Sequence, residues 1–407
     1  MRKLIFFLFI FFLFKVLSYA EVLNWIQLKN FLKENNPEIQ NALRNIDKYK
    51  LLYKSSKAEF YPDFSISGSV RKSKNSDTGS SIGIAGKLDL FRGFKNSISL
   101  DISKIEVENR KLELKRILAD KTYNLRIAYG EVVYLKNLIK ILEKILKRKK
   151  ENLDIVVLRY EAGKEDIGVK LKQEADFKAS LFELEKRKRE LEVKKTKILK
   201  ELNANFETFE ITGTLKFTFN KDIELNEIIG YIPEYQIKEN EIELAKLNLN
   251  YDRAPFYPEL NLTGSVSKSG DKFSLDENSW NLGVNISYPF FSKGKNFYNL
   301  EISKIELKKS EGNFSDKVNE LKLNLKEVHT DLINSVENIE VVKLYLNATK
   351  ERAKIARIKY VNGLISYEDW DRIENDYINA EKNLLEAEFS AFRNYALFLK
   401  VIGREEL

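Results

Sequence analysis

Residues suited to catalysis are scarce in this chain of 407 residues. Its one histidine, His329, lies in the helical pattern LKEVHTDL, and the chain has no cysteine. A Ser-His-Asp arrangement or a zinc site of His and Cys ligands therefore has too few residues to be built from. Gly79, Gly83 and Gly86 fall in a strand-like segment rather than between a strand and a helix, so they do not predict a phosphate-binding loop. We expect no enzymatic activity and no cofactor.

The charged residues are numerous but nearly balanced. The chain has 69 Lys and Arg against 61 Asp and Glu, a formal net charge of +8. The lysine-rich run LKRKKENL at 146–153 lies in a stretch that also carries acids, which is typical of a solvated helix face. A nucleic-acid footprint would need clustered cations on one surface. We expect no nucleic-acid partner.

The N-terminus predicts export. Arg2 and Lys3 precede an apolar run at residues 4–14, and Ser18 and Ala20 are the small residues that a signal peptidase accepts. This order is typical of a signal peptide over residues 1–20, with cleavage before Glu21. The alternative is a membrane anchor, but the run is short for a span of about 20 residues. No later apolar stretch is long enough for a transmembrane helix, so an exported product would be free in the envelope, secreted, or inserted through strands.

The remainder of the chain is a duplication. Residues 60–70 read FYPDFSISGSV, and 256–266 read FYPELNLTGSV, 196 positions later. LDISKIE at 100–106 returns as LEISKIE at 300–306, 200 positions later. The second half thus has four extra residues between these motifs, which we place in the exposed loop of a strand hairpin. A period near 200 is too long for a solenoid repeat of about 20–50 residues, so we interpret it as a duplicated structural unit.

In each half, the sequence pattern predicts a helix, a strand hairpin, a long helix and then a second helix. Apolar residues alternate at steps of three and four along the long tracts, as in coiled coils. Gly163 and Gly363 follow these tracts and predict turns into antiparallel partners. The first repeat spans 21–203, with a strand hairpin at 63–91 and helices at 94–160 and 169–202. A linker at 204–231 leads to the second repeat at 232–407, with a hairpin at 259–290 and helices at 294–360 and 367–402.

The hairpin segments alternate apolar and polar residues with a period of two, as in FSISGSV and LNLTGSV. Each half contributes two strands of about 10 residues, with aromatic residues at the bases nearest the helices. Membrane barrels show this pattern, and so does one face of a soluble sandwich. Four strands cannot close a barrel alone, so several chains would have to share one; three chains would give twelve strands.

In this order, the pieces resemble a TolC-type outer-membrane factor, the exit duct of efflux and type I secretion systems. The resemblance covers residues 21–407 and rests on NNPEIQNAL at 35–43, its weaker echo YIPEYQIKEN at 231–240, the FYP motifs, and the RYEAG and KYVNG turns. It implies a mainly α fold with a β-barrel part, in which long antiparallel helical hairpins form a periplasmic tunnel. A homotrimer would complete a twelve-stranded barrel in outer-membrane lipid. Pro62 and Pro258 would mark the helix–strand boundaries, and the linker 204–231 would be equatorial.

The resemblance also implies functional residues at the tunnel tip. A periplasmic adaptor would dock at the turns marked by Arg159, Tyr160 and Gly163 and by Tyr360 and Gly363. An inner-membrane pump or ABC transporter would supply the energy.

The family's lumenal aspartate corresponds by count to Asp369, beside Glu368 and Asp371. Threefold symmetry would make these acids a cation-favouring ring, a periplasmic gate. A second family aspartate falls on Arg372, so a two-tier ring is in doubt, although Asp371 is a possible substitute. These acids would equally stabilise the start of a helix.

We therefore predict a passive duct through the outer membrane that extends into the periplasm and opens at its tip. The alternative is a periplasmic coiled-coil scaffold or adhesin without a pore. Four alternating strands with aromatic bases favour the duct, because a scaffold has no need of them.

Overall fold

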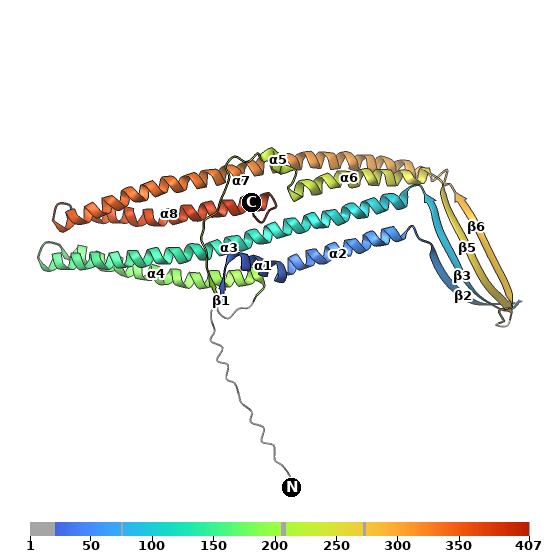
Figure 1. The fold of residues 1–407 in the computed structure, drawn as a ribbon, viewed down its shortest axis with the longest axis horizontal. Coiled ribbons are helices and arrows are strands. Elements are labelled where there is room, and N and C mark those ends of the chain that lie inside the picture. The colour runs from blue at the N-terminus through green and yellow to red at the C-terminus, as the bar shows by residue number, and fades with distance from the viewer. Residues whose placement is uncertain (1–20, 75, 205–208, 272–273, 407) are drawn as a thin grey trace, which may run out of the picture. The chain divides into compact units, whose positions relative to one another are not determined.

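The computed structural model describes residues 21–74, 76–204, 209–271 and 274–406. The predicted signal peptide, residues 1–20, lies outside the described residues. The elements in chain order are β1 (Glu21–Leu23), α1 (Trp25–Asn35), α2 (Pro37–Ala58), β2 (Asp63–Ser73), β3 (Ser76–Arg92), α3 (Lys95–Glu161), α4 (Ile167–Leu202), β4 (Phe209–Ile211), α5 (Leu225–Ile229), α6 (Pro233–Arg253), the 3₁₀ turn η1 (Ala254–Phe256), β5 (Glu259–Asp271), β6 (Glu277–Ser287), α7 (Lys295–Val361) and α8 (Tyr367–Val401). The predicted long helices and four antiparallel strands are confirmed (Figure 1).

The chain divides into two compact units. The first comprises the described residues of 1–32, 125–216 and 342–389, and the second those of 33–124, 217–341 and 390–407. The helices α3 and α7, of 67 residues each, contribute to both units. Each would span about 100 Å at 1.5 Å per residue. Within the described residues, none of the helices combines the length and the apolar character that crossing a membrane requires.

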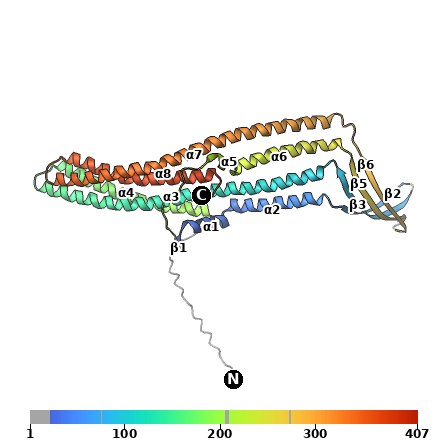
Figure 2. The same ribbon diagram turned by 45° about the horizontal axis from the view of Figure 1, so that its top comes forward.

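In the second unit, β2, β3, β5 and β6 form an antiparallel sheet in that order. Figure 2 shows α2 and α6 ending at the base of this sheet, where α3 and α7 begin. Pro62 directly precedes β2, and Pro258 directly precedes β5. Proline suits these positions because it lacks the N–H that a helix interior or a central strand requires.

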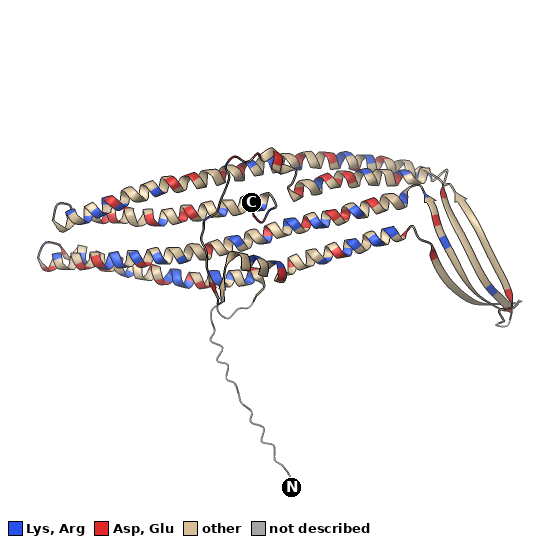
Figure 3. Cartoon of the chain, viewed as in Figure 1, with Lys and Arg blue, Asp and Glu red and all other residues tan. Residues whose placement is uncertain are grey.

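The sheet sorts its side chains into two faces. One cross-strand row reads Ile66, Ile84, Val266 and Trp280, and the neighbouring row reads Ser67, Gly83, Ser267 and Ser279. The apolar row is largely exposed, with Ile66 at 76% and Trp280 at 78%. The polar face makes its own hydrogen bonds, such as Ser267 Oγ to Ser279 Oγ at 2.7 Å. Charged residues are sparse in the middle of the strands and concentrated on the helices (Figure 3).

Strand register locates the four extra residues of the second half. Ile66 pairs with Ile84, 18 positions later, whereas Leu262 pairs with Val284, 22 positions later. The difference therefore arises at the far end of the hairpin, and the prediction of a longer second loop is confirmed. At the base, β6 ends at Ser287, three residues before the expected end at 290, whereas β3 continues to Arg92.

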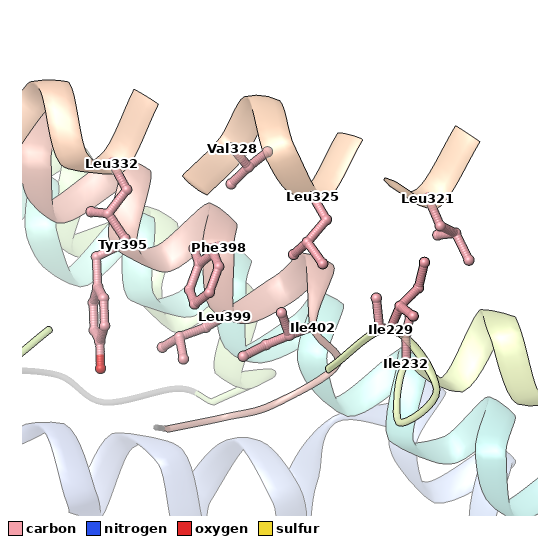
Figure 4. Packing of buried hydrophobic residues seen from close by; sticks show 10 residues of the cluster. All are labelled: Ile229, Ile232, Leu321, Leu325, Val328, Leu332, Tyr395, Phe398, Leu399 and Ile402. Atoms are coloured by element: carbon pink, nitrogen blue, oxygen red, sulfur yellow. The ribbon is translucent and has the colours of Figure 1, made fainter. Parts of the chain in front are cut away.

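Each unit has its own apolar core. In the first unit, the apolar seam of α3, formed by residues that recur at steps of three and four, is buried at Leu125, Ala128, Val132, Leu135 and Leu142. In the second, the seam of α7 packs on the end of α8 and on the chain around α5 (Figure 4). That cluster consists of Ile229, Ile232, Leu321, Leu325, Val328, Leu332, Tyr395, Phe398, Leu399 and Ile402.

The region between the repeats is tied to the helices. In the first unit, β4 pairs in parallel with β1, and Glu210 accepts hydrogen bonds from Lys136 of α3 at 2.5 Å and Lys195 of α4 at 3.0 Å. In the second unit, Phe217 stacks on Tyr395 with ring centroids 4.4 Å apart. The single histidine, His329, packs there between aromatic rings. It therefore has a packing role rather than a catalytic one.

The two strand-to-helix junctions share an unusual backbone. Gly93 and Phe94 have φ of +60° and +69°, and their counterparts Lys293 and Gly294 have +54° and +78°. Two consecutive left-handed residues thus precede each long helix, and each pair includes one glycine, which adopts this conformation without strain. A Cβ on Gly93 would lie 2.5 Å from the backbone oxygen of Ala254, whereas one on Gly294 would lie 3.4 Å from a flexible tyrosine ring.

This difference predicts unequal costs of the same substitution. Gly93→Ala and Gly294→Ala both force an L-residue into the left-handed region, at a cost of about 1–2 kcal/mol. Gly93→Ala must in addition displace the backbone at Ala254, so we expect the larger drop in thermal midpoint, followed by helical circular dichroism of the purified protein. Equal drops for the two variants would show that the backbone contact at Ala254 is unimportant.

Candidate functional site

In the first unit, two equivalent turns end the helical hairpins α3–α4 and α7–α8. Gly163 donates its N–H to the carbonyl oxygen of Tyr160 at 3.0 Å, and Lys164 donates to that of Arg159 at 2.8 Å. The second turn repeats both bonds 200 positions later, at 2.9 and 2.8 Å. This pairing is the Schellman motif, which requires a left-handed residue at the glycine position. Gly163 and Gly363 have φ of +69° and +73°.

The helices that follow the turns are capped by side chains. Asp166 accepts a hydrogen bond from the N–H of Val169 at 3.0 Å. At α8, the Ser366 hydroxyl accepts from the N–H of Asp369 at 3.1 Å and donates to its carboxylate at 3.3 Å. Asp369 also lies 3.2 Å from Arg372. Asp369 is therefore an exposed residue that helps to begin the helix, the role that the capping interpretation assigns to it.

Aromatic residues join the two hairpins beside the turns. The rings of Tyr360 and Trp370 stack with centroids 4.3 Å apart, and both side chains are 1% exposed. The Tyr360 hydroxyl donates to Glu165 at 2.7 Å, and the Arg159 guanidinium lies 4.6 Å from the Tyr360 ring centroid. Burial and the bond to Glu165 raise the pKa of Tyr360, so the hydroxyl stays a donor. Val156, Val169, Ala356 and Tyr367 complete the cluster.

Farther from the turns, the seam between α3 and α8 becomes polar. Lys149 of α3 is 5% exposed, and its ammonium lies 3.2 Å from the Asn375 side-chain oxygen and 3.6 Å from Asp371. Asp371 also accepts a hydrogen bond from Lys172 of α4 at 2.5 Å. Burial lowers the pKa of Lys172, but hydrogen bonds to Asp371 and to the Tyr367 hydroxyl outweigh it, so the net shift is upward. One carboxylate thus links both helices of the first hairpin to α8.

A second ion cluster lies on the same seam. Arg148 of α3 bonds to Glu381 and lies 3.2 Å from Glu374, both on α8, while its guanidinium covers the ring of Tyr377 at 4.5 Å. Glu374 is 6% exposed. Burial raises the pKa of Glu374, although nearby Arg148 and Lys149 oppose the shift. The carboxylates of Glu374 and Glu381 share the guanidinium of Arg148, and the charged form of Glu374 is the less well stabilised of the two.

The predicted tip residues thus fall into different environments. Glu368 and Asp369 are exposed, whereas Asp371 lies in the ion cluster with a side chain 13% exposed. Among the docking residues, Tyr160 and the two glycines are exposed, whereas Tyr360 is buried in the aromatic cluster. The structure brings Arg159 and Tyr360 together through a hydrogen bond to the Tyr360 carbonyl oxygen at 3.0 Å.

The sequence reasoning missed Arg148, Lys149, Lys172 and Glu374. A signal for two of them was present. The seam of α3 continues at steps of three and four from Leu142 to Lys149, and that of α8 passes through Asp371 and Glu374. A charged residue at a coiled-coil core position predicts a buried polar contact. Among the described residues, no group of three or more His, Cys, Asp and Glu is placed to hold a metal ion.

The duplicated hairpins match a known family over most of the chain. The model of the family "outer membrane efflux protein" matches residues 29–200 and again residues 234–404. The chain belongs to this family. An outer membrane efflux protein is a channel and not an enzyme, and it extends from the outer membrane into the periplasm. Membership also implies a trimeric channel in a tripartite export system.

Known proteins are similar to this outer membrane efflux protein over most of its length. The cation efflux system protein CusC of Escherichia coli (strain K12) is 20% identical over 405 residues, covering 93% of this chain and 86% of its own. The open-state structure of the Neisseria gonorrhoeae MtrE outer membrane channel aligns with a TM-score of 0.82 and 18% identity, over 94% of this chain and 89% of that one. VceC from Vibrio cholerae gives 0.81 and 15%, over 93% and 96%. These structures show the same fold.

The environment of Glu374 predicts a pH dependence. Its pKa is raised on folding, so the folded state binds the proton more tightly than the unfolded state. The resulting stabilisation is complete below the ordinary carboxyl pKa and is lost as pH rises through the raised one. We expect the stability of the native chain relative to Glu374→Gln to fall over that window, measured as thermal midpoints between pH 4 and pH 8. An unchanged difference would contradict the assignment, and Glu185→Gln, on the surface of α4, serves as the control.

Proposed function

We propose that three copies of this efflux protein form one conduit, with a shared barrel in the outer membrane and a helical tunnel that is closed at its periplasmic tip. The observation that carries this proposal is the open sheet. Within the described residues, β2 and β6 each have one edge without a partner strand. An unpaired backbone group costs several kcal/mol in a bilayer, where no water can replace the partner. A sheet whose apolar face is exposed therefore needs neighbours at both edges.

The helices of the first unit support the same assembly. Leu171, Phe182 and Val193 of α4 are between 56% and 67% exposed and recur every 11 residues, which places them on one stripe. Leu344, Ile355 and Ile358 of α7 are exposed to a similar degree. Apolar stripes of this kind mark contacts with other chains. We assign them to the neighbouring copies in the tunnel wall.

The closed tip is held, in this proposal, by the contacts between the two hairpins of each chain. Lys172 and Lys149 hold Asp371, and the Tyr360 hydroxyl donates to Glu165. Glu368 and Asp369 are free of this network and remain exposed, so they are the residues that symmetry can gather into a carboxylate ring. Opening then requires α8 to separate from α3 and α4, which breaks the ion pairs.

A periplasmic adaptor is the partner that would drive this separation, and an inner-membrane pump or ABC transporter would provide the energy. The two turns offer it different chemistry. The first presents Glu161 and Lys164, whereas the second presents Val361 and Leu364, the latter 71% exposed. An adaptor that contacts both turns needs a polar site for one and an apolar site for the other.

Fractionation and cross-linking test the assembly. We expect the protein in the outer-membrane fraction, and we expect a lysine-reactive cross-linker to yield species up to three copies and no larger. The physical reason is the closure of a four-stranded sheet by two further copies. A soluble periplasmic monomer would support the alternative of a scaffold without a pore and overturn the proposal.

Single-channel recording tests the gate. Asp371→Asn removes the carboxylate charge that pairs with Lys172 and Lys149, so we expect a larger conductance in planar bilayers without an adaptor. Asp154→Asn breaks only a surface pair within α3, with Lys150 at 2.8 Å, and should leave conductance unchanged. Asp369→Ala should weaken block by multivalent cations. Unchanged conductance in the first variant and unchanged cation affinity in the last would rule out the two parts of the gate separately.

A further inference from the structure

The duplication reproduces strand pairing residue by residue. Positions on β5 lie 196 after their equivalents on β2, and positions on β6 lie 200 after their equivalents on β3. The pair Ile66–Ile84 accordingly returns as Leu262–Val284, and Asp63–Lys87 returns as Glu259–Ser287. The two hairpins therefore have the same register. Repeat equivalence is thus a reliable guide to which residues face each other in this sheet.

Between the hairpins, β3 pairs with β5. This junction places Ile84 opposite Val266, Lys87 opposite Thr263, and Arg92 opposite Glu259. It is the point where one repeat meets the next. Among the described residues, 88–92 pair with β5 alone, because the β2–β3 ladder ends at Lys87.

The outer edges of β2 and β6 correspond to the two sides of this junction. The outer edge of β6 is equivalent to the edge of β3 that pairs with β5, and the outer edge of β2 is equivalent to the edge of β5 that pairs with β3. β6 ends at Ser287, although residues 288–292 are the equivalents of 88–92. Tyr288, Phe290 and Phe291 in this segment are 54%, 88% and 75% exposed. The segment is strand-like in its equivalent and lacks a partner strand among the described residues. Phe290 donates its N–H to the carbonyl oxygen of Tyr288 at 2.9 Å, so the segment turns locally here, and a neighbouring strand would have to replace this bond.

We propose that β6 of one copy pairs with β2 of a second copy in the register of the β3–β5 junction, and that residues 288–292 extend β6 when they do so. This inference rests on the proposed assembly of several chains and specifies its strand interface. Subtracting the repeat offsets places Val284 opposite Val70, Ser287 opposite Ser67, and Ser292 opposite Asp63 of the second copy.

The resulting pairs match in chemistry. Val284 meets Val70 on the apolar face, as Ile84 meets Val266 within the chain, and Ser287 meets Ser67 on the polar face. A slip of one residue would place every apolar side chain on the polar face. A slip of two residues keeps every side chain on its face but breaks the equivalence with the β3–β5 junction. In the proposed register Leu282 faces Lys72, just as the equivalent Ile82 faces Lys268 within the chain.

The one departure in the extended segment also fits. Pro289 is the equivalent of Asp89, and proline cannot donate a backbone hydrogen bond. Within the chain, the register shifts between Asp89 and Phe91, so the ladder is already interrupted there. Prolines in sheets are confined to edges and such irregularities.

Engineered disulfides test the register, because the chain has no cysteine of its own. Ser287→Cys combined with Ser67→Cys changes two serines to isosteric cysteines that we place directly opposite each other in different copies. The control is Gly283→Cys with Ser67→Cys, shifted by four residues, where no atom lies within 4 Å of an added Cβ. That shift is about 13 Å along the strand, beyond disulfide reach. Lys87→Cys with Thr263→Cys is the equivalent pair within one chain.

After oxidation in isolated outer membranes, we expect S287C/S67C to give covalent dimers and trimers on non-reducing gels. The shifted control should stay monomeric on the same gels, and K87C/T263C should form its bond without joining chains. If native gels show the intact assembly but S287C/S67C does not cross-link, or the shifted pair does, the register is wrong while the proposed function stands. If native gels show monomers in the membrane, both fail.

Discussion

The structure depends on one unsatisfied requirement, the hydrogen bonds of two strand edges. Within the part of the chain that the structure describes, the four-stranded antiparallel sheet pairs its inner strands on both sides and leaves β2 and β6 each with one open edge. In water such an edge would be solvated, and natural sheets protect it with charges, bulges or coverage. Here the exposed cross-strand row that contains Ile66 and Trp280 is apolar, which suits a bilayer. In a bilayer no water can hydrogen-bond to the open strand edges. A sheet of this kind in a bilayer would therefore need neighbouring strands at both edges, which the proposed assembly supplies.

The contacts between the helices differ from one unit to the other. The second unit is closed by an apolar cluster around Leu325 and Phe398, whereas the seam of α3 and α8 near the turns carries charges. Burying ions gives little net stability, because the cost of desolvation offsets their attraction, but removing one partner costs about 3–5 kcal/mol. A seam of this kind holds two hairpins in one arrangement without the large cohesive energy of a packed core. It is suited to a contact that must separate and form again.

Much of this architecture could be predicted from the sequence because the signals are periodic and occur twice. The two long helices, the four strands and the longer second loop all follow from repeat offsets and spacing. The charged seam was not predicted, because Lys149 and Glu374 resemble ordinary helix-surface residues until the opposing helix is in place. Tyr360 shows the same limit. The resemblance assigned it to an adaptor-docking turn but gave no sign that packing against Trp370 buries it. Burial depends on which faces meet across the hairpins, and a single sequence does not encode that directly.

The unequal hairpin tips have a consequence for symmetry. In a ring of repeats, the strand ladder treats the two halves of each chain as equivalent, so three copies would present six nearly identical hairpin stems. Their tips would not be equivalent, because the second hairpin has four more residues between equivalent paired positions than the first. Long and short loops would alternate around the outer rim. Such a rim has only threefold symmetry, and a molecule approaching from outside would meet three projecting loops rather than six.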